Sequence, residues 1–165
     1  MTPQAIARAD LLRKEALLAI PINAAVSAVF FLIVFGWSAV ATTALAIDFL
    51  PQTMGMTALG IIVPSIVTLK KIAAGKVTPA GPRPTLGRLI LIFPAAVVTA
   101  TVVFGGIAAL LLTGLANTVL TPWVAVALKA AYGGFVGFVM TPPILRVVLG
   151  MPVLPRRGRA PSAVR

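Results

Sequence analysis

The sequence contains no cysteine and no histidine, and only three of its 165 residues are acidic. Without a thiol or an imidazole, the chain has no thiol redox centre, no haem held by His or Cys, and no zinc site of the usual ligands. No paired carboxylates, Ser/His arrangement or glycine-rich phosphate loop is apparent either. These absences predict a protein that is not an enzyme and that carries no metal or other cofactor.

Charge is scarce as well, at 10% of the residues, whereas a soluble domain carries about 25%. Hydrophobic residues make up 59% of the chain, and the mean hydropathy is +1.07. Forty consecutive uncharged residues separate Arg88 from Lys129, although one membrane crossing needs only roughly 20. The composition therefore predicts an all-α integral membrane protein.

Charges and turn residues divide the hydrophobic part into a four-transmembrane-helix bundle. The expected helices lie near 20–43, 53–69, 89–113 and 123–148. Asp48 and Pro51 predict a tight turn at 48–52 between the first two. A cleaved secretory signal is the alternative for the first hydrophobic stretch, but that stretch is too long and lacks a clear cleavage site.

The chain then divides into five segments with alternating character. These are a cytoplasmic N-terminal segment at 1–15, which could form a short interfacial helix, a first transmembrane hairpin at 16–71, a basic Pro/Gly-rich cytoplasmic loop at 72–88, a second transmembrane hairpin at 89–149, and a disordered basic tail at 150–165. Twelve of the 14 basic residues lie outside the expected helices, and Arg146 lies in the last turn of the fourth. By the positive-inside rule, we expect both termini and the loop on the cytoplasmic side of a bacterial inner membrane.

The net charge of +11 would suggest nucleic acid as the partner of a soluble protein. Here the basic residues flank hydrophobic stretches, which favours anionic lipid headgroups as their partners and excludes nucleic acid.

A weak internal repeat relates the two halves. Residues 24–28 (AAVSA) match 96–100 (AVVTA), and Pro51 falls opposite Pro122. The segments WVAVALKA at 123–130 and TPPILRVV at 141–148 resemble a family of small bacterial two-span membrane proteins that is known only as a domain of unknown function. The stretch from Asp48 to Lys71 resembles a more divergent copy that lacks the Trp and the Lys. The resemblance implies a tandem pair of parallel helical hairpins over residues 20–149, and it implies no activity.

Lys129 and Asp48 are the candidate functional residues. Lys129 is the one basic residue that lies inside an expected helix and away from its last turn. Its long side chain could extend to the outer headgroups. Alternatively, it could face the bundle interior, paired with Asp48 or binding an anion. For Asp48, the simpler interpretation is a cap at the start of the second helix.

Small residues and prolines provide the remaining candidates. Close helix packing, within the chain or in a homodimer, is expected at Gly105, Gly106, Gly133, Gly134 and Gly137. Helix kinks are expected at Pro64, Pro142 and Pro143. Trp123 and Tyr132 are expected to anchor the helix at the membrane interface.

These features favour a structural or accessory membrane component that binds a second copy or another membrane protein, because few polar groups are available to line a path. The alternative is a small transporter or channel, for an anion, with Lys129 near the outer entrance. A proton-coupled pump like the four-span multidrug exporters is disfavoured, because it needs a membrane carboxylate and none is expected in the helices. If Lys129 and Asp48 share one inward face, transport is favoured; if Lys129 points to the headgroups, the structural role is favoured.

Overall fold

The computed structural model describes residues 2–82, 84–115 and 118–152, which form an all-helical bundle with one very short strand pair. Its helical elements are α1 (Pro3–Phe35), α2 (Thr42–Ala73), α3 (Leu86–Ala100), the π-helical turn η1 (Thr101–Gly105), α4 (Gly106–Thr113) and α5 (Pro122–Val148). Because α3, η1 and α4 follow one another without a break, the described residues contain four helices long and apolar enough to cross a membrane. The predicted helical bundle with four such helices is confirmed.

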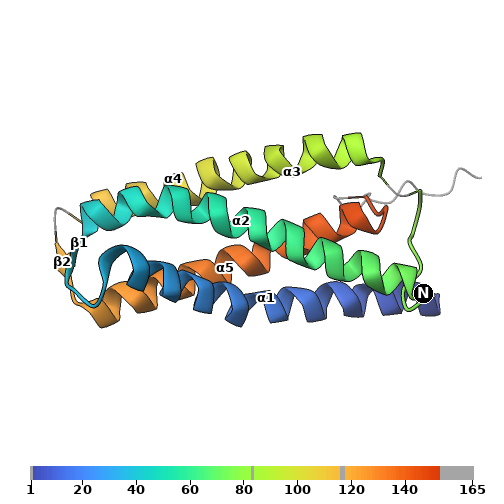
Figure 1. Ribbon diagram of the computed structural model, residues 1–165, viewed down its shortest axis with the longest axis horizontal. Helices are drawn as coiled ribbons and strands as arrows, with labels where there is room; N and C mark the ends of the chain where they lie inside the picture. Colours follow the sequence, from blue (N-terminus) through green and yellow to red (C-terminus); the bar gives the residue numbers. More distant parts are fainter. Residues whose placement is uncertain (1, 83, 116–117, 153–165) are drawn as a thin grey trace, which may run out of the picture.

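The two ends of the bundle differ in character (Figure 1). At one end, which we call the β end, β1 (Val40–Ala41) pairs antiparallel with β2 (Val119–Leu120). The rings of Trp37 and Trp123 pack edge to face there, with centroids 4.6 Å apart. At the opposite end, which we call the basic end, the N-terminus, the α2–α3 loop and the end of α5 come together.

The first turn lies earlier in the chain than the sequence predicts. Helix α1 ends at Phe35. The next residue, Gly36, has a positive φ of 62°, which suits a residue without a Cβ, and α2 begins at Thr42. The predicted turn at 48–52 is therefore wrong, because these residues lie inside α2. Pro51 interrupts the helical hydrogen bonds without ending the helix, and it leaves the Ile47 carbonyl without its usual helical donor.

The other predicted boundaries differ less. Residues 3–15 do not form a separate helix, because α1 begins at Pro3 and runs on without a break. The side chain of Thr2 caps this helix by accepting a hydrogen bond from the Ala5 N–H at 3.3 Å. Helices α2 and α5 are continuous through Pro64, Pro142 and Pro143. Beyond residue 152, the predicted tail lies outside the described residues.

Each helix of one half of the sequence has its main contacts arranged differently from those of a simple hairpin. Helix α1 packs mainly against α5, the α3–η1–α4 helix packs against α2, and α2 and α5 form the central pair (Figure 1). The first helix of each half thus packs on the second helix of the other half, which is not how two self-contained hairpins would pair. The suggested match of Pro51 with Pro122 is wrong, because Pro51 lies well inside α2 whereas Pro122 begins α5.

Two apolar clusters close the interior of the bundle. The cluster near the β end contains Phe31, Val40, Leu45, Ala46, Phe49, Leu112 and Ala125. The cluster at the basic end contains Leu11, Leu12, Ile72, Leu145 and Leu149. The helix segments between these clusters bury polar side chains instead. The candidate site lies where this polar interior meets the cluster near the β end.

Candidate functional site

Lys129 lies on α5 and is fully buried, with an exposed fraction of 0%. Its Nζ donates a hydrogen bond to Oδ2 of Asp48, which lies on α2 and keeps 15% of its side chain exposed. The expectation that Lys129 extends to the headgroups is wrong, because α5 turns this position toward α2, where Asp48 provides a partner. Asp48 does not cap a helix either, because it lies in the second turn of α2.

Aromatic rings surround the ammonium group of Lys129. Its Nζ lies 5.6 Å from the ring centroid of Phe35 and 5.9 Å from those of Phe31 and Phe49. Rings at this distance attract a cation through their negative faces. They also keep water away from the pair, which strengthens the attraction between the two charges. The site is an ion pair held in an apolar setting, and Asp48 already occupies the place that an anion would take.

Tyr132 continues the polar interior one turn beyond Lys129. Its hydroxyl lies 2.6 Å from Oγ1 of Thr53, which donates its own hydrogen to the Phe49 carbonyl at 2.5 Å. Because Thr53 has only one hydroxyl hydrogen, Tyr132 is the donor in their contact. The expectation that Tyr132 anchors the helix at the membrane interface is wrong, because its polar tip is engaged inside the bundle.

A second polar group connects α1 with α2. The side-chain amide of Gln52 donates to Oγ of Ser27 at 2.5 Å, and Ser27 donates to the sulfur of Met56 at 2.9 Å. One turn nearer the basic end, Asn23 donates to the Ala19 carbonyl at 2.8 Å. These side chains are buried, so polar groups line the bundle interior from α5 across α2 to α1.

Helix α2 carries five buried side-chain oxygen atoms that have no hydrogen-bond partner among the described residues. They belong to Thr42, Gln52, Thr57, Ser65 and Thr68. At 1.5 Å per residue, they are spread over roughly 40 Å of helix, and they do not all lie on one face. An unpaired polar group in an apolar interior costs about 1–3 kcal/mol, so five of them on one helix call for an explanation.

At the basic end, a second ion pair joins Lys71 to Glu15, with 2.5 Å between Nζ and Oε1. Both side chains line a cavity of about 420 Å³ between α1 and α2. Asn23 contributes to the wall of this cavity, and the other lining residues are mostly apolar. The cavity therefore connects the polar interior near Asn23 with the charged pair at the basic end.

The glycines of α5 contact α1 closely. A Cβ at Gly133 would lie 2.7 Å from the Asn23 carbonyl oxygen, and one at Gly137 would lie 3.0 Å from that of Ala19. Gly134 is nearly as close, 3.3 Å from the Ile20 carbonyl oxygen. The predicted close-packing glycines of α5 thus pack within the chain, on the face of α1 that carries Asn23 and Ser27.

Of the glycine pair in the third long helix, only Gly105 packs closely against a neighbouring helix. A Cβ at Gly105 would lie 3.1 Å from Oγ1 of Thr53, whereas one at Gly106 would meet nothing within 4 Å. The packing role expected of Gly106 is therefore wrong. Gly105 does pack closely, and its neighbours lie on α2.

The sequence indicated the two charged residues but not the polar interior around them. The sequence pattern predicts no role for Asn23, Ser27 or Thr53, and it places Gln52 in the expected turn at 48–52. A usable signal was present: Asn23 and Ser27 are four residues apart, as are Gly133 and Gly137, which they contact. No group of metal-ligating side chains occurs within the described ranges.

No protein-family model, curated protein or solved structure matches the chain. The geometry of the site therefore carries the functional argument on its own.

Proposed function

We propose that the chain is a multi-pass protein of the bacterial inner membrane that moves protons, alone or coupled to a small polar solute, through the interior of its helix bundle. The Asp48–Lys129 pair acts as the gate of this path. The observation that carries the proposal is the full burial of Lys129, paired with a largely buried Asp48, in a bundle interior that also holds unpaired polar side chains of α2.

A buried ion pair is a poor way to stabilise a bundle. Removing two charges from water costs several kcal/mol per ion, and apolar residues of similar size often replace such a pair without loss of stability. Ionisable side chains inside a membrane are rare and mark ion or substrate pathways. Asp48 also removes the objection to proton coupling, because the membrane carboxylate thought to be missing lies within α2.

The remaining polar groups supply a route from this gate. Thr53 and Tyr132 lie next to the pair, Gln52 and Ser27 follow, and Asn23 opens onto the cavity that ends at Glu15 and Lys71. A proton bound by Asp48 would neutralise the partner of Lys129 and release the contact between α2 and α5. An anion is a poor substrate, because Asp48 already neutralises Lys129.

We further propose that the basic end faces the cytoplasm, because the basic residues concentrate there. The absence of native cysteine makes this testable with single substitutions at exposed positions, Ser38→Cys at the β end and Thr78→Cys at the basic end. In intact cells, an impermeant maleimide should label the first variant only, and permeabilised cells should label both. Labelling of Thr78→Cys alone in intact cells would reverse the orientation.

The proposed transport is tested by proton flux into vesicles that contain the purified chain. Under an imposed membrane potential, a trapped pH dye should report faster acidification than in protein-free vesicles. Lys129→Met should reduce the rate to the protein-free level, because the gate loses one of its charges. Gly106→Ala is the control and should leave the rate unchanged, since a Cβ at that position meets nothing within 4 Å.

If the wild-type vesicles acidify no faster than empty ones, the transport proposal fails. The second candidate is then a non-enzymatic structural or accessory component. It is favoured by the three phenylalanine rings around Lys129 of α5, two from α1 and one from α2, which pack the three helices together. The α5 glycine face is already covered by α1, so a homodimer or a membrane-protein partner would have to use another surface. A stoichiometric partner in a native mass measurement would identify this role.

A further inference from the structure

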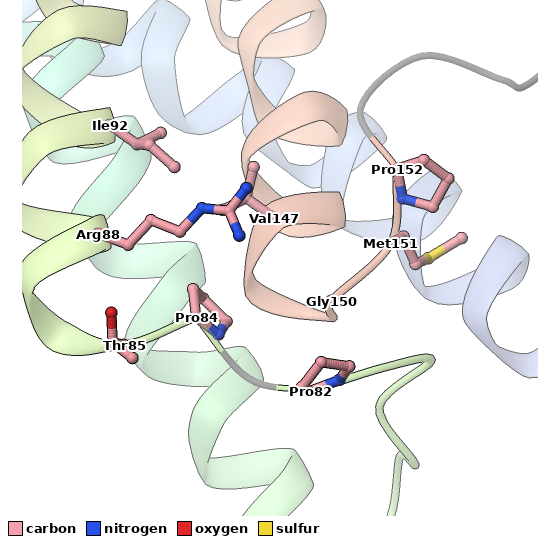
Figure 2. Close-up of a pocket in the computed structure, with 9 residues that line it drawn as sticks. All are labelled: Pro82, Pro84, Thr85, Arg88, Ile92, Val147, Gly150, Met151 and Pro152. Carbon is pink, nitrogen blue, oxygen red and sulfur yellow. The ribbon is translucent and has the colours of Figure 1, made fainter.

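A cavity of about 650 Å³ opens at the basic end, between the start of α3 and the end of α5 (Figure 2). Its walls come from the proline-rich segment before α3, from the first two turns of α3, and from the last turn of α5 with the residues that follow it. It lies apart from the Asp48–Lys129 pair, which is located toward the β end of the bundle.

The walls of this cavity are fixed to one another by backbone contacts. The Ala80 N–H donates to the Leu149 carbonyl at 2.8 Å, which joins the α2–α3 loop to the end of α5. Next to this bond, a Cβ at Gly81 would lie 3.0 Å from the Gly150 carbonyl oxygen, and Gly150 itself has a φ of 66°. Only glycine fits this approach without a shift, so the cavity is part of the fold.

Arg88 directs its guanidinium group across the cavity toward Val147 (Figure 2). None of the described residues forms an ion pair with it. The chain has only three acidic side chains, of which Glu15 pairs with Lys71 and Asp48 with Lys129. The third, Asp10, lies on α1, and the residues outside the described ranges include no Asp or Glu. Among the described residues no carboxylate is paired with Arg88, so its guanidinium group is open to an anion from another molecule.

The rest of the cavity is suited to an amphiphile. Ile92 and Val147 form an apolar wall beyond the guanidinium group, in the direction in which α3 and α5 enter the bundle (Figure 2). Arg88 also lies in the first turn of α3, where backbone N–H groups without helical partners favour a negative charge. A planar guanidinium binds a phosphate with two parallel hydrogen bonds.

We infer that this cavity binds one anionic phospholipid from the leaflet at the basic end. Arg88 holds the lipid phosphate, and Ile92 and Val147 contact the upper part of an acyl chain. The inference goes beyond the proposed transport function and does not depend on it, because the cavity and the gate share no residue.

The inference is tested by native mass spectrometry of the full chain in a mild detergent with added phosphatidylglycerol or phosphatidylcholine. The wild type should retain one phosphatidylglycerol per chain and little phosphatidylcholine. Arg88→Gln should weaken this retention about tenfold, the effect expected from losing a charged hydrogen bond of roughly 1.5 kcal/mol. Arg13→Gln, which removes the same charge from an exposed position on α1, should leave it unchanged.

Two further measurements separate the cavity from general charge effects. Ile92→Trp fills the cavity without changing the net charge and should also abolish retention. Glycerol 1-phosphate at millimolar concentration should not displace the lipid, because it lacks the acyl chain. Equal retention by wild type and Arg88→Gln, equal binding of both lipids, or displacement by glycerol 1-phosphate would each overturn the inference.

Discussion

Asp48→Leu should destabilise the bundle by about 3–5 kcal/mol, because it leaves the fully buried ammonium group of Lys129 without its partner. Lys129→Met should cost less, since Asp48 is partly exposed and can recruit water. The double variant Asp48→Leu/Lys129→Met should lie within about 1 kcal/mol of the wild type, because apolar residues of similar size often replace a buried ion pair without loss.

These stabilities can be measured by titrating detergent micelles with sodium dodecyl sulfate and following the loss of helix by circular dichroism. The four proteins form a double-mutant cycle, which isolates the interaction between the two side chains. If the double variant loses as much stability as the sum of the two single variants, the side chains are not coupled and the described pair does not form.

Gly133→Val should separate α1 from α5. A Cβ at Gly133 would lie 2.7 Å from the Asn23 carbonyl oxygen and 2.8 Å from the Met56 methyl carbon, so the α1 backbone itself would have to move. Overpacking of this kind costs about 1–3 kcal/mol, and more where the neighbour is backbone. We expect a loss of at least 3 kcal/mol in the same unfolding assay, the second largest effect.

Gly106→Val is the matched control, because it makes the same change where a Cβ meets nothing within 4 Å. It should change the unfolding free energy by less than about 0.5 kcal/mol. Equal losses in the two variants would show that glycine itself, through backbone flexibility, matters at both positions. The close packing of α5 on α1 would then not be the cause.

The sequence predicts the helices well because apolar composition and length are properties of whole segments. It misplaces the first turn because Asp48 and Pro51 are turn residues by local chemistry. Inside α2, Asp48 pairs with Lys129, which lies far away in the sequence but adjacent in the bundle, so no local signal reveals this partner. The actual end of α1 is indicated in the sequence only by Gly36, a single residue.

The candidate site shows the same limit. Single charges in an apolar chain are conspicuous, so Lys129 and Asp48 can be found without a structure. The polar side chains around them are threonine, serine, asparagine and glutamine, which occur on any helix face. Their common burial follows only from the exchange of helix partners, which brings α1 against α5. The buried position of Tyr132 could not be predicted either, because its partner Thr53 lies on α2, 79 residues away in the sequence.

The most direct test of the gate is the proton flux of the double variant Asp48→Leu/Lys129→Met in vesicles, beside the wild type. This variant should keep the fold and so isolates the function of the charges from their effect on stability. Our account predicts a flux equal to that of protein-free vesicles. A flux equal to that of the wild type would show that the pair only holds α2 against α5, and it would contradict the proposed gate.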